Sequence, residues 1–82
     1  MDETYSHNSV VQAVLFRKVD WDLRSSMKWL DNNHFKAKKV DITNNWFRYR
    51  IYEPIALKNK GFTHYANKYI EDESIILVIS YK

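Results

Sequence analysis

Residues 39–50 of the chain read KVDITNNWFRYR, two runs of alternating side chains around an Asn-Asn pair. Asn tolerates the left-handed backbone that a tight turn requires, so this pattern predicts a β-hairpin of residues 37–42 and 46–53. A turn at Asn44-Asn45 also fixes the register of the two strands. The predicted cross-strand pairs are Ile42–Phe47, Asp41–Arg48, Val40–Tyr49 and Lys39–Arg50.

Because side chains alternate along a strand, this register sorts the hairpin into two faces. One face is expected to lie in the core, and it holds Val40, Ile42, Phe47, Tyr49 and Ile51. The other face carries Thr43 and Asp41 together with five residues that form the candidate binding site, which we call the hairpin row: Lys39, Trp46, Arg48, Arg50 and Tyr52.

The hairpin row has two interpretations. Aromatic rings interleaved with arginines on a sheet can stack on bases and contact phosphates, and Lys36 and Lys38 would add phosphate contacts. An anion would also relieve the like-charge pair of Lys39 and Arg50. The same residue types suit an ordinary solvated face in which Asp41 forms a cross-strand ion pair with Arg48. The sequence leaves both interpretations open.

The N-terminal half predicts a strand followed by a helix. Residues 9–18 (SVVQAVLFRK) are apolar on both faces, as in a central strand. Asp22 is a good N-cap for a helix that runs to about Asn33, with one of residues 32–34 at positive φ. The expected core stripe of this helix is Leu23, Met27 and Leu30.

The C-terminal half is less regular. Residues 54–69 contain a turn signal at residues 58–61, and a short strand is expected around residues 62–65. An acidic turn at residues 71–73 then precedes a strong strand, SIILVISYK, at residues 74–82. The fold predicted is α+β, with one helix packed on a mostly antiparallel sheet of about four strands in the order β-α-β-β-β.

Length and composition agree with one small domain. The chain has 82 residues and a net charge of +3, which is only mildly basic. We expect a flexible tail at residues 1–8 and a single domain at residues 9–82. No apolar run reaches the roughly 18 residues needed to cross a membrane, so no membrane association is expected.

The residue types needed for catalysis are scarce. Cysteine is absent, which excludes disulfides, thiolate metal sites and cysteine nucleophiles. The three histidines, His7, His34 and His64, do not have metal-ligand spacing. Gly61 is the only glycine, so there is no glycine-rich phosphate loop. We therefore expect no enzymatic activity, no metal and no cofactor.

Two parts of the sequence carry a resemblance. Residues 39–50 contain Lys39-Val40-Asp41-Ile42-Thr43 and Arg48-Tyr49-Arg50, and Trp21 and Trp29-Leu30 lie upstream. This W…WL…KVDxT…R[FY]R pattern resembles a small uncharacterised domain of tailed-phage and large-DNA-virus proteins. The chain departs from that domain at His34, where glycine is usual, and at Ser26, where alanine is usual. The resemblance implies a viral or mobile-element origin, in the host cytoplasm or the virion, and no activity.

Three functions follow as hypotheses. The first is a protein-interaction or virion-associated structural module, in which the apolar final strand serves strand addition or self-association. The second is a nucleic-acid-binding module that uses the hairpin row, and the third is an inhibitor of a host protein. Binding that weakens steeply with salt would favour nucleic acid, and salt-insensitive association would favour a protein partner.

Overall fold

A computed structural model describes residues 9–82, so the tail expected at residues 1–8 lies outside the described part. The described part of the chain is α+β, with two helices and one five-stranded sheet. The elements, in chain order, are β1 (Ser9–Arg17), α1 (Leu23–Asn32), β2 (Lys39–Ile42), β3 (Trp46–Arg50), α2 (Pro54–Asn59), β4 (His64–Ile70) and β5 (Ile75–Tyr81).

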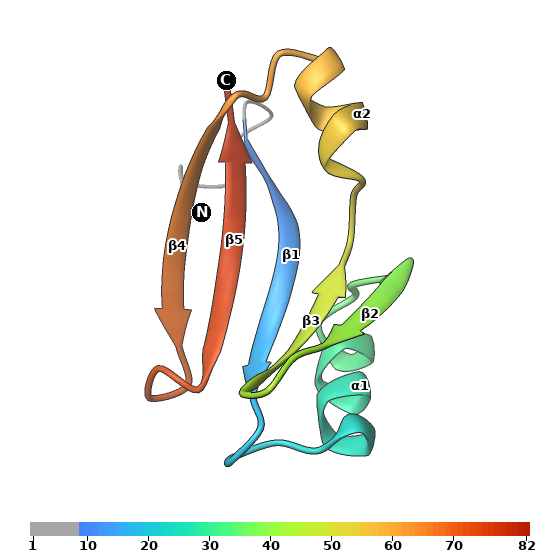
Figure 1. The fold of residues 1–82 in the computed structure, drawn as a ribbon, viewed down its shortest axis with the longest axis vertical. Helices are drawn as coiled ribbons and strands as arrows, with labels where there is room; N and C mark the ends of the chain where they lie inside the picture. The colour runs from blue at the N-terminus through green and yellow to red at the C-terminus, as the bar shows by residue number, and fades with distance from the viewer. Residues whose placement is uncertain (1–8) are drawn as a thin grey trace.

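The strands lie in the order β2-β3-β1-β5-β4, and every neighbouring pair is antiparallel (Figure 1). The first strand is central, as its two apolar faces predicted, with Ala13, Val14 and Phe16 fully buried. The final strand lies between β1 and β4, so the expectation that it offers a free edge is wrong. The two edges belong to β2 and β4.

The hairpin of β2 and β3 has the predicted register, with Lys39 opposite Arg50 and Ile42 opposite Phe47. Its strands are shorter than predicted: β2 begins at Lys39 and β3 ends at Arg50. The Thr43 hydroxyl accepts a hydrogen bond from Trp46 N–H at 3.1 Å and closes the turn.

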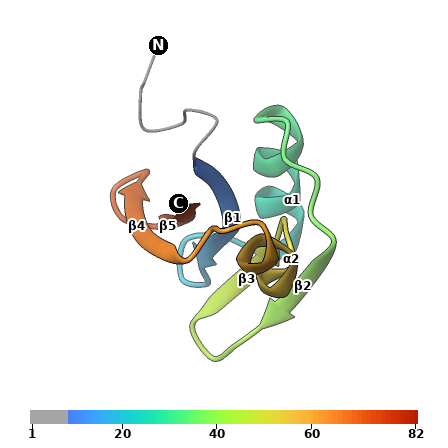
Figure 2. The ribbon, with the colours of Figure 1, turned by 90° about the horizontal axis from the view of Figure 1, so that it is seen from above.

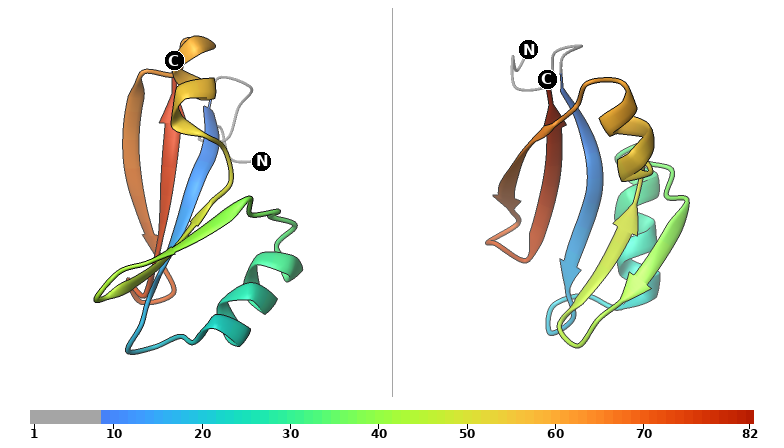
Figure 3. Two further views of the ribbon diagram at one scale, coloured as in Figure 1. Left: turned by 45° about the vertical axis from the view of Figure 1, so that its right-hand side comes forward. Right: turned by 45° about the horizontal axis from the view of Figure 1, so that its top comes forward.

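The core lies between α1 and one face of the sheet. Two views at different angles show α1 on that side of the sheet (Figure 3). Phe16 is its centre, with the rings of Trp21, Trp29 and Tyr49 at 5.2, 5.6 and 5.5 Å in edge-on contacts. The hydroxyls of Ser26 and Tyr49 are 2.7 Å apart and hydrogen bond inside this core.

The orientation of α1 corrects the predicted core stripe. Ser26 and Leu30 are buried, but Leu23 is 40% exposed and Met27 is 58% exposed. Trp29 packs edge-on against Phe16, and the small Ser26 lets the helix approach Tyr49. Burial of the Trp29 indole removes more apolar surface from water than burial of Met27 would, so the helix is rotated with Trp29 facing the core.

The ends of α1 follow the sequence. The Asp22 carboxylate accepts a hydrogen bond from Ser25 N–H at 2.7 Å, and Ser25 Oγ accepts from Asp22 N–H at 3.1 Å. The bond from the Ser25 backbone holds the pKa of Asp22 below its ordinary value. The helix exit has one residue at positive φ, His34 at 64°, as expected for residues 32–34.

The segment of residues 54–69 is more regular than predicted. It contains α2, which begins with Pro54 at its first turn, and most of β4, which is seven residues long instead of a short strand around residues 62–65.

Seen from above, the sheet curves from β4 round to β2, and α1 lies to one side of it (Figure 2). The acidic turn between β4 and β5 is confirmed, and Glu71, Asp72 and Glu73 all have left-handed backbones.

Candidate interaction surfaces

The sheet face turned away from α1 holds four residues of the hairpin row, Lys39, Trp46, Arg48 and Arg50, and continues across the other strands of the sheet. Phe16 belongs to the core, so the alternation along β1 places Leu15 on the opposite face. Leu15 pairs with Arg48 on one side and Ile76 on the other, and Ile76 pairs with Tyr69. We call this surface the second face, and its residues are Leu15, Arg17, Trp46, Arg48, Arg50, Tyr65, Tyr69, Ile76 and Val78.

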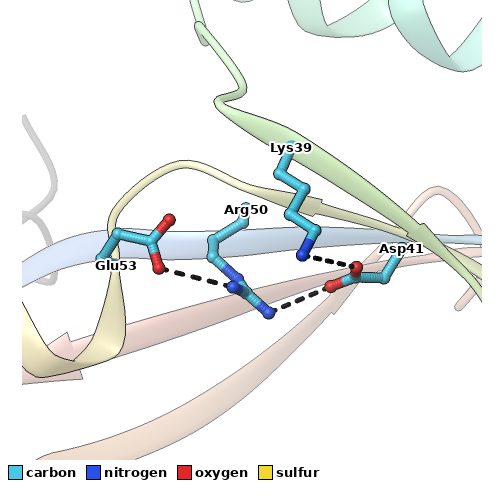
Figure 4. Close-up of polar contacts among 4 residues, drawn as sticks. All are labelled: Lys39, Asp41, Arg50 and Glu53. Carbon is cyan, nitrogen blue, oxygen red and sulfur yellow. Dashed lines mark hydrogen bonds and ion pairs between the residues drawn. The ribbon is translucent and has the colours of Figure 1, made fainter.

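Carboxylates neutralise two of the three cations of the hairpin row, Lys39 and Arg50 (Figure 4). Arg50 Nη2 lies 3.0 Å from Asp41 Oδ2, and its Nη1 lies 3.4 Å from Glu53 Oε1. Lys39 Nζ lies 3.8 Å from the other Asp41 oxygen. Asp41 therefore bridges Lys39 and Arg50, which supplies the anion that this like-charge pair requires. The ion pair expected between Asp41 and Arg48 does not form.

The remaining members of the row are separated. Trp46 and Arg48 are half-buried on the second face, and Arg48 forms no ion pair within residues 9–82. Tyr52 lies beyond the end of β3, where it is 42% exposed and lines a groove described below. Of the five predicted residues, only Trp46 and Arg48 remain as an aromatic and cationic pair without a carboxylate.

Sequence reasoning did not find two further members of this surface. Tyr65 and Tyr69 are 54% and 55% exposed on β4, and they face the same side as Arg48. Their spacing of four residues is compatible with one face of a strand. However, the strand itself was predicted to end at Tyr65, so the tyrosines could not be placed on one face.

A groove of about 690 Å³ runs between α1 and the edge strand β2. Leu30 and Tyr49 are its buried apolar residues. Its exposed apolar residues are Leu23 and Met27 on the helix, Ala37 before the strand, and Val40, which is 39% exposed, on the strand. The charged residues Lys28, Asp31, Lys38 and Lys39 also line it. Ile42, the next residue of β2 on the core side, is 57% exposed. Val40 and Ile42 were predicted to be core residues, but nothing within residues 9–82 covers the outer side of β2.

Within the described residues, no strand pairs with the outer side of β2. Thr43 N–H donates to Trp46 O at 2.9 Å, so this pair of residues is hydrogen bonded across the hairpin. Hydrogen-bonded pairs alternate along an antiparallel ladder, so Asp41 and Lys39 direct their backbone groups toward β3. The N–H and C=O groups of Val40 and Ile42 therefore point outward from the sheet. We call the groove and this edge together the α1–β2 surface: Leu23, Met27, Val40 and Ile42.

A second groove, of about 850 Å³, lies beyond the C-terminal end of α1. Its apolar lining includes Trp29, Phe35 and Leu77, and His34, Lys36 and Lys38 also line it. Lys36 and Lys38 therefore lie away from Trp46 and Arg48, on the α1 side of the sheet. Ser9 and Val10 line the same groove, directly after the residues that the structure leaves undescribed.

Within residues 9–82, no group of three or more His, Asp or Glu side chains could hold a metal ion. Neither helix of the described chain is long and apolar enough to cross a membrane. Comparison with family models, with curated proteins and with solved structures gave no match to this chain.

Proposed function

We propose that this protein is a protein-interaction module and that its docking site is the α1–β2 surface. The observation that carries the proposal is the position of Leu23, Met27, Val40 and Ile42, which are all at least 39% exposed and lie together beside an unpaired strand edge. Exposed apolar side chains gathered on one side of a small domain are typical of a binding surface.

The same edge suits a partner in extended conformation. A strand added beside β2 would satisfy the outward backbone groups of Val40 and Ile42, while its apolar side chains would cover Met27 and Leu23. Nucleic acid fits this surface less well than a protein strand, since Leu23, Met27, Val40 and Ile42 are aliphatic or thioether side chains that offer no stacking. Lys28, Lys38 and Lys39 line the groove beside them.

A capture experiment tests the proposal. The immobilised protein is incubated with lysate, with and without nuclease, and compared with Met27→Glu and with a matched control, Ile55→Glu. Ile55 is 64% exposed on α2 and does not line the groove. We expect nuclease-resistant capture by the unmodified chain and by Ile55→Glu, and loss of capture with Met27→Glu. Capture that nuclease abolishes, or that Met27→Glu leaves intact, would contradict the proposal.

The alternative is a nucleic-acid-binding module on the second face, supported by Trp46, Arg48, Tyr65 and Tyr69. Because Arg50 is held by two carboxylates, Arg48 is the residue expected to contact phosphate. Arg48→Ala should then lower the slope of log affinity against log salt concentration. Trp46→Ala should leave that slope unchanged and weaken binding by about 1–3 kcal/mol, because a stacked base is lost.

The resemblance to a viral domain supports two versions of the interaction module. In one the partner is a virion component, and in the other it is a host protein that the module inhibits. Both use the α1–β2 surface, so identification of the captured protein by mass spectrometry separates them.

A further inference from the structure

We infer that the occupant of the α1–β2 surface is a second copy of this chain, paired antiparallel through β2 in one register. This inference rests on the proposed function, and it names the partner. It is carried by the charges and apolar residues of β2, which complement themselves in that register.

The register centres on Val40. If Val40 lies opposite Val40 of the second copy, Lys39 lies opposite Asp41, and Asp41 lies opposite Lys39. Residues directly opposite each other point to the same side of a sheet, so both Lys–Asp pairs form on one side and the valines meet on the other. A shift by one residue along each strand would place Asp41 against Asp41, which repulsion disfavours.

The backbone at Val40 suits this pairing. Its N–H and C=O point outward, so two copies exchange two hydrogen bonds at the centre of the joint. Lys39 is able to change partners, because its side chain is 60% exposed and its nitrogen lies 3.8 Å from its own Asp41 oxygen, a loose contact. Arg50 stays bound to Asp41 at 3.0 Å and keeps that carboxylate in position.

The apolar residues complete the joint. Antiparallel pairing of two identical strands has its two-fold axis perpendicular to the sheet, so both α1 helices lie on the same side of one continuous sheet. Met27 and Leu23 of each copy then face the other copy across the pair of Val40 residues. The exposed half of α1, which residues 9–82 of one chain leave uncovered, becomes buried between two chains.

Cysteine cross-linking tests the register, and the chain contains no cysteine of its own to interfere. The full chain is made as Val40→Cys and, as a matched control, Ile42→Cys, which is exposed on the same side of the same strand. In the proposed register the two cysteines of a Val40→Cys dimer lie within disulfide distance. The two cysteines of an Ile42→Cys dimer are four positions out of line, or more than about 13 Å apart.

We expect mild oxidation to give a covalent dimer for Val40→Cys and at least tenfold less for Ile42→Cys. Equal cross-linking of both variants, or stronger cross-linking of Ile42→Cys, would overturn the register. Light scattering of the unmodified chain across a concentration range gives the second measurement. A mass that stays at the 9.9 kDa of one chain at every concentration would overturn the dimer.

A charge exchange adds a test that loss of folding cannot imitate. Lys39→Asp and Asp41→Lys should each be monomeric alone, because like charges then oppose each other, and their mixture should form a heterodimer. Circular dichroism checks that each variant is folded. If one of the charge variants does not fold, Met27→Glu, which alters no charge pair, is measured in its place and should itself be monomeric. A mixture that remains monomeric, with both chains folded, would overturn the pairing. If Met27→Glu still abolishes capture from lysate, the interaction module stands with another partner.

Discussion

Leu30 and Met27 lie one turn apart on α1, and their surroundings differ completely. Leu30 is 4% exposed in the core, and Met27 is 58% exposed beside β2. Truncation of Leu30 therefore leaves a cavity against the sheet, whereas truncation of Met27 removes atoms that already contact water.

We expect Leu30→Ala to lower the free energy of unfolding by about 2–5 kcal/mol, and Leu77→Ala on β5 to do the same. Met27→Ala should change it by no more than about 0.5 kcal/mol under monomeric conditions. Urea denaturation of the three variants at low protein concentration measures these values. A large loss with Met27→Ala in the monomer would mean that the helix is rotated toward the predicted stripe.

The sequence identified the apolar residues of α1 but not which of them face the sheet. Helical spacing fits the predicted stripe of Leu23, Met27 and Leu30. It fits equally well the residues that do face the core, Ser26, Trp29 and Leu30. The choice depends on the contact of Trp29 with Phe16 and on the bond between Ser26 and Tyr49. Both contacts join residues far apart in the sequence, so helical periodicity alone does not reveal them.

The N-terminus of α1 makes stability depend on pH. The ionised Asp22 carboxylate accepts the hydrogen bond from Ser25 N–H more strongly than the protonated acid does, so the pKa of Asp22 is lower in the folded chain than in the unfolded chain. A lowered folded pKa contributes stability above the unfolded value, near 3.8, and this stability is lost as pH falls through the folded pKa.

Asp22→Asn keeps a good capping side chain but cannot titrate. We expect the variant and the unmodified chain to melt at similar temperatures at pH 7. As the pH falls below about 4, the variant should lose less stability than the unmodified chain. Thermal melts followed by circular dichroism at several pH values test this, and parallel curves for the two proteins would contradict it.

The turn between β4 and β5 stores backbone strain. Three consecutive residues without glycine, Glu71, Asp72 and Glu73, have φ of 51°, 55° and 66°. Side chains disfavour this conformation, and glycine does not. The turn is nevertheless fixed, because Ser74 N–H and Ser74 Oγ both donate to Glu71 O, and Trp21 Nε1 donates to Ser74 Oγ at 2.9 Å.

We expect Glu73→Gly to raise the free energy of unfolding by up to about 1 kcal/mol, since relief of strain exceeds the added freedom of the unfolded chain. Glu73→Ala is the control, because it removes the same charge but keeps a Cβ. Chemical denaturation of both variants gives the comparison. An equal gain for both would assign the effect to charge and not to the backbone.

The elements at residues 54–70 show where local sequence is insufficient. α2 has six residues, too few to display helical periodicity, and its only local signal is Pro54 at the first turn. Along β4 six of seven residues are exposed, so no alternation of apolar and polar residues marks it as a strand. This strand exists because β5 pairs with it, and the pairing is a property of the whole sheet. The hairpin of β2 and β3, by contrast, contains its own turn, so its register was predicted correctly, although its strands are shorter than predicted.

At the scale of the molecule, β1 joins the two halves of the sheet. It pairs with β3 on one side and with β5 on the other, so neither the β2–β3 hairpin nor the β4–β5 hairpin forms the core alone. The candidate site shows the same division. Trp46 and Arg48 were found from the hairpin, whereas Leu15, Ile76 and Tyr69 joined them only through the strand order.

The pairing of β1 with β5 also brings two distant positions together, because Ser9 lies opposite Tyr81. A circular permutant that joins Lys82 to Ser9 through a short Gly-Ser linker, and opens the chain at Asp72, should therefore fold. It turns β5 and β1 into neighbours in sequence and releases the left-handed turn. We expect its circular dichroism spectrum to match that of a linear chain of residues 9–82, with a melting temperature within about 5 °C. An unfolded permutant beside a folded linear control would contradict the register of β1 and β5.

The first and last strand residues of the described chain, Ser9 and Tyr81, lie side by side on neighbouring strands. Another protein could contain residues 9–82 as an insert within one of its own surface loops, because the two junctions would be only a strand spacing apart, about 5 Å. The strands of the receiving protein on either side of that loop would keep their separation. Residues 9–82 are thus suited to insertion into unrelated proteins as one unit. The β2 edge would stay accessible in such an insert, because β3 separates β2 from the junctions on β1 and β5.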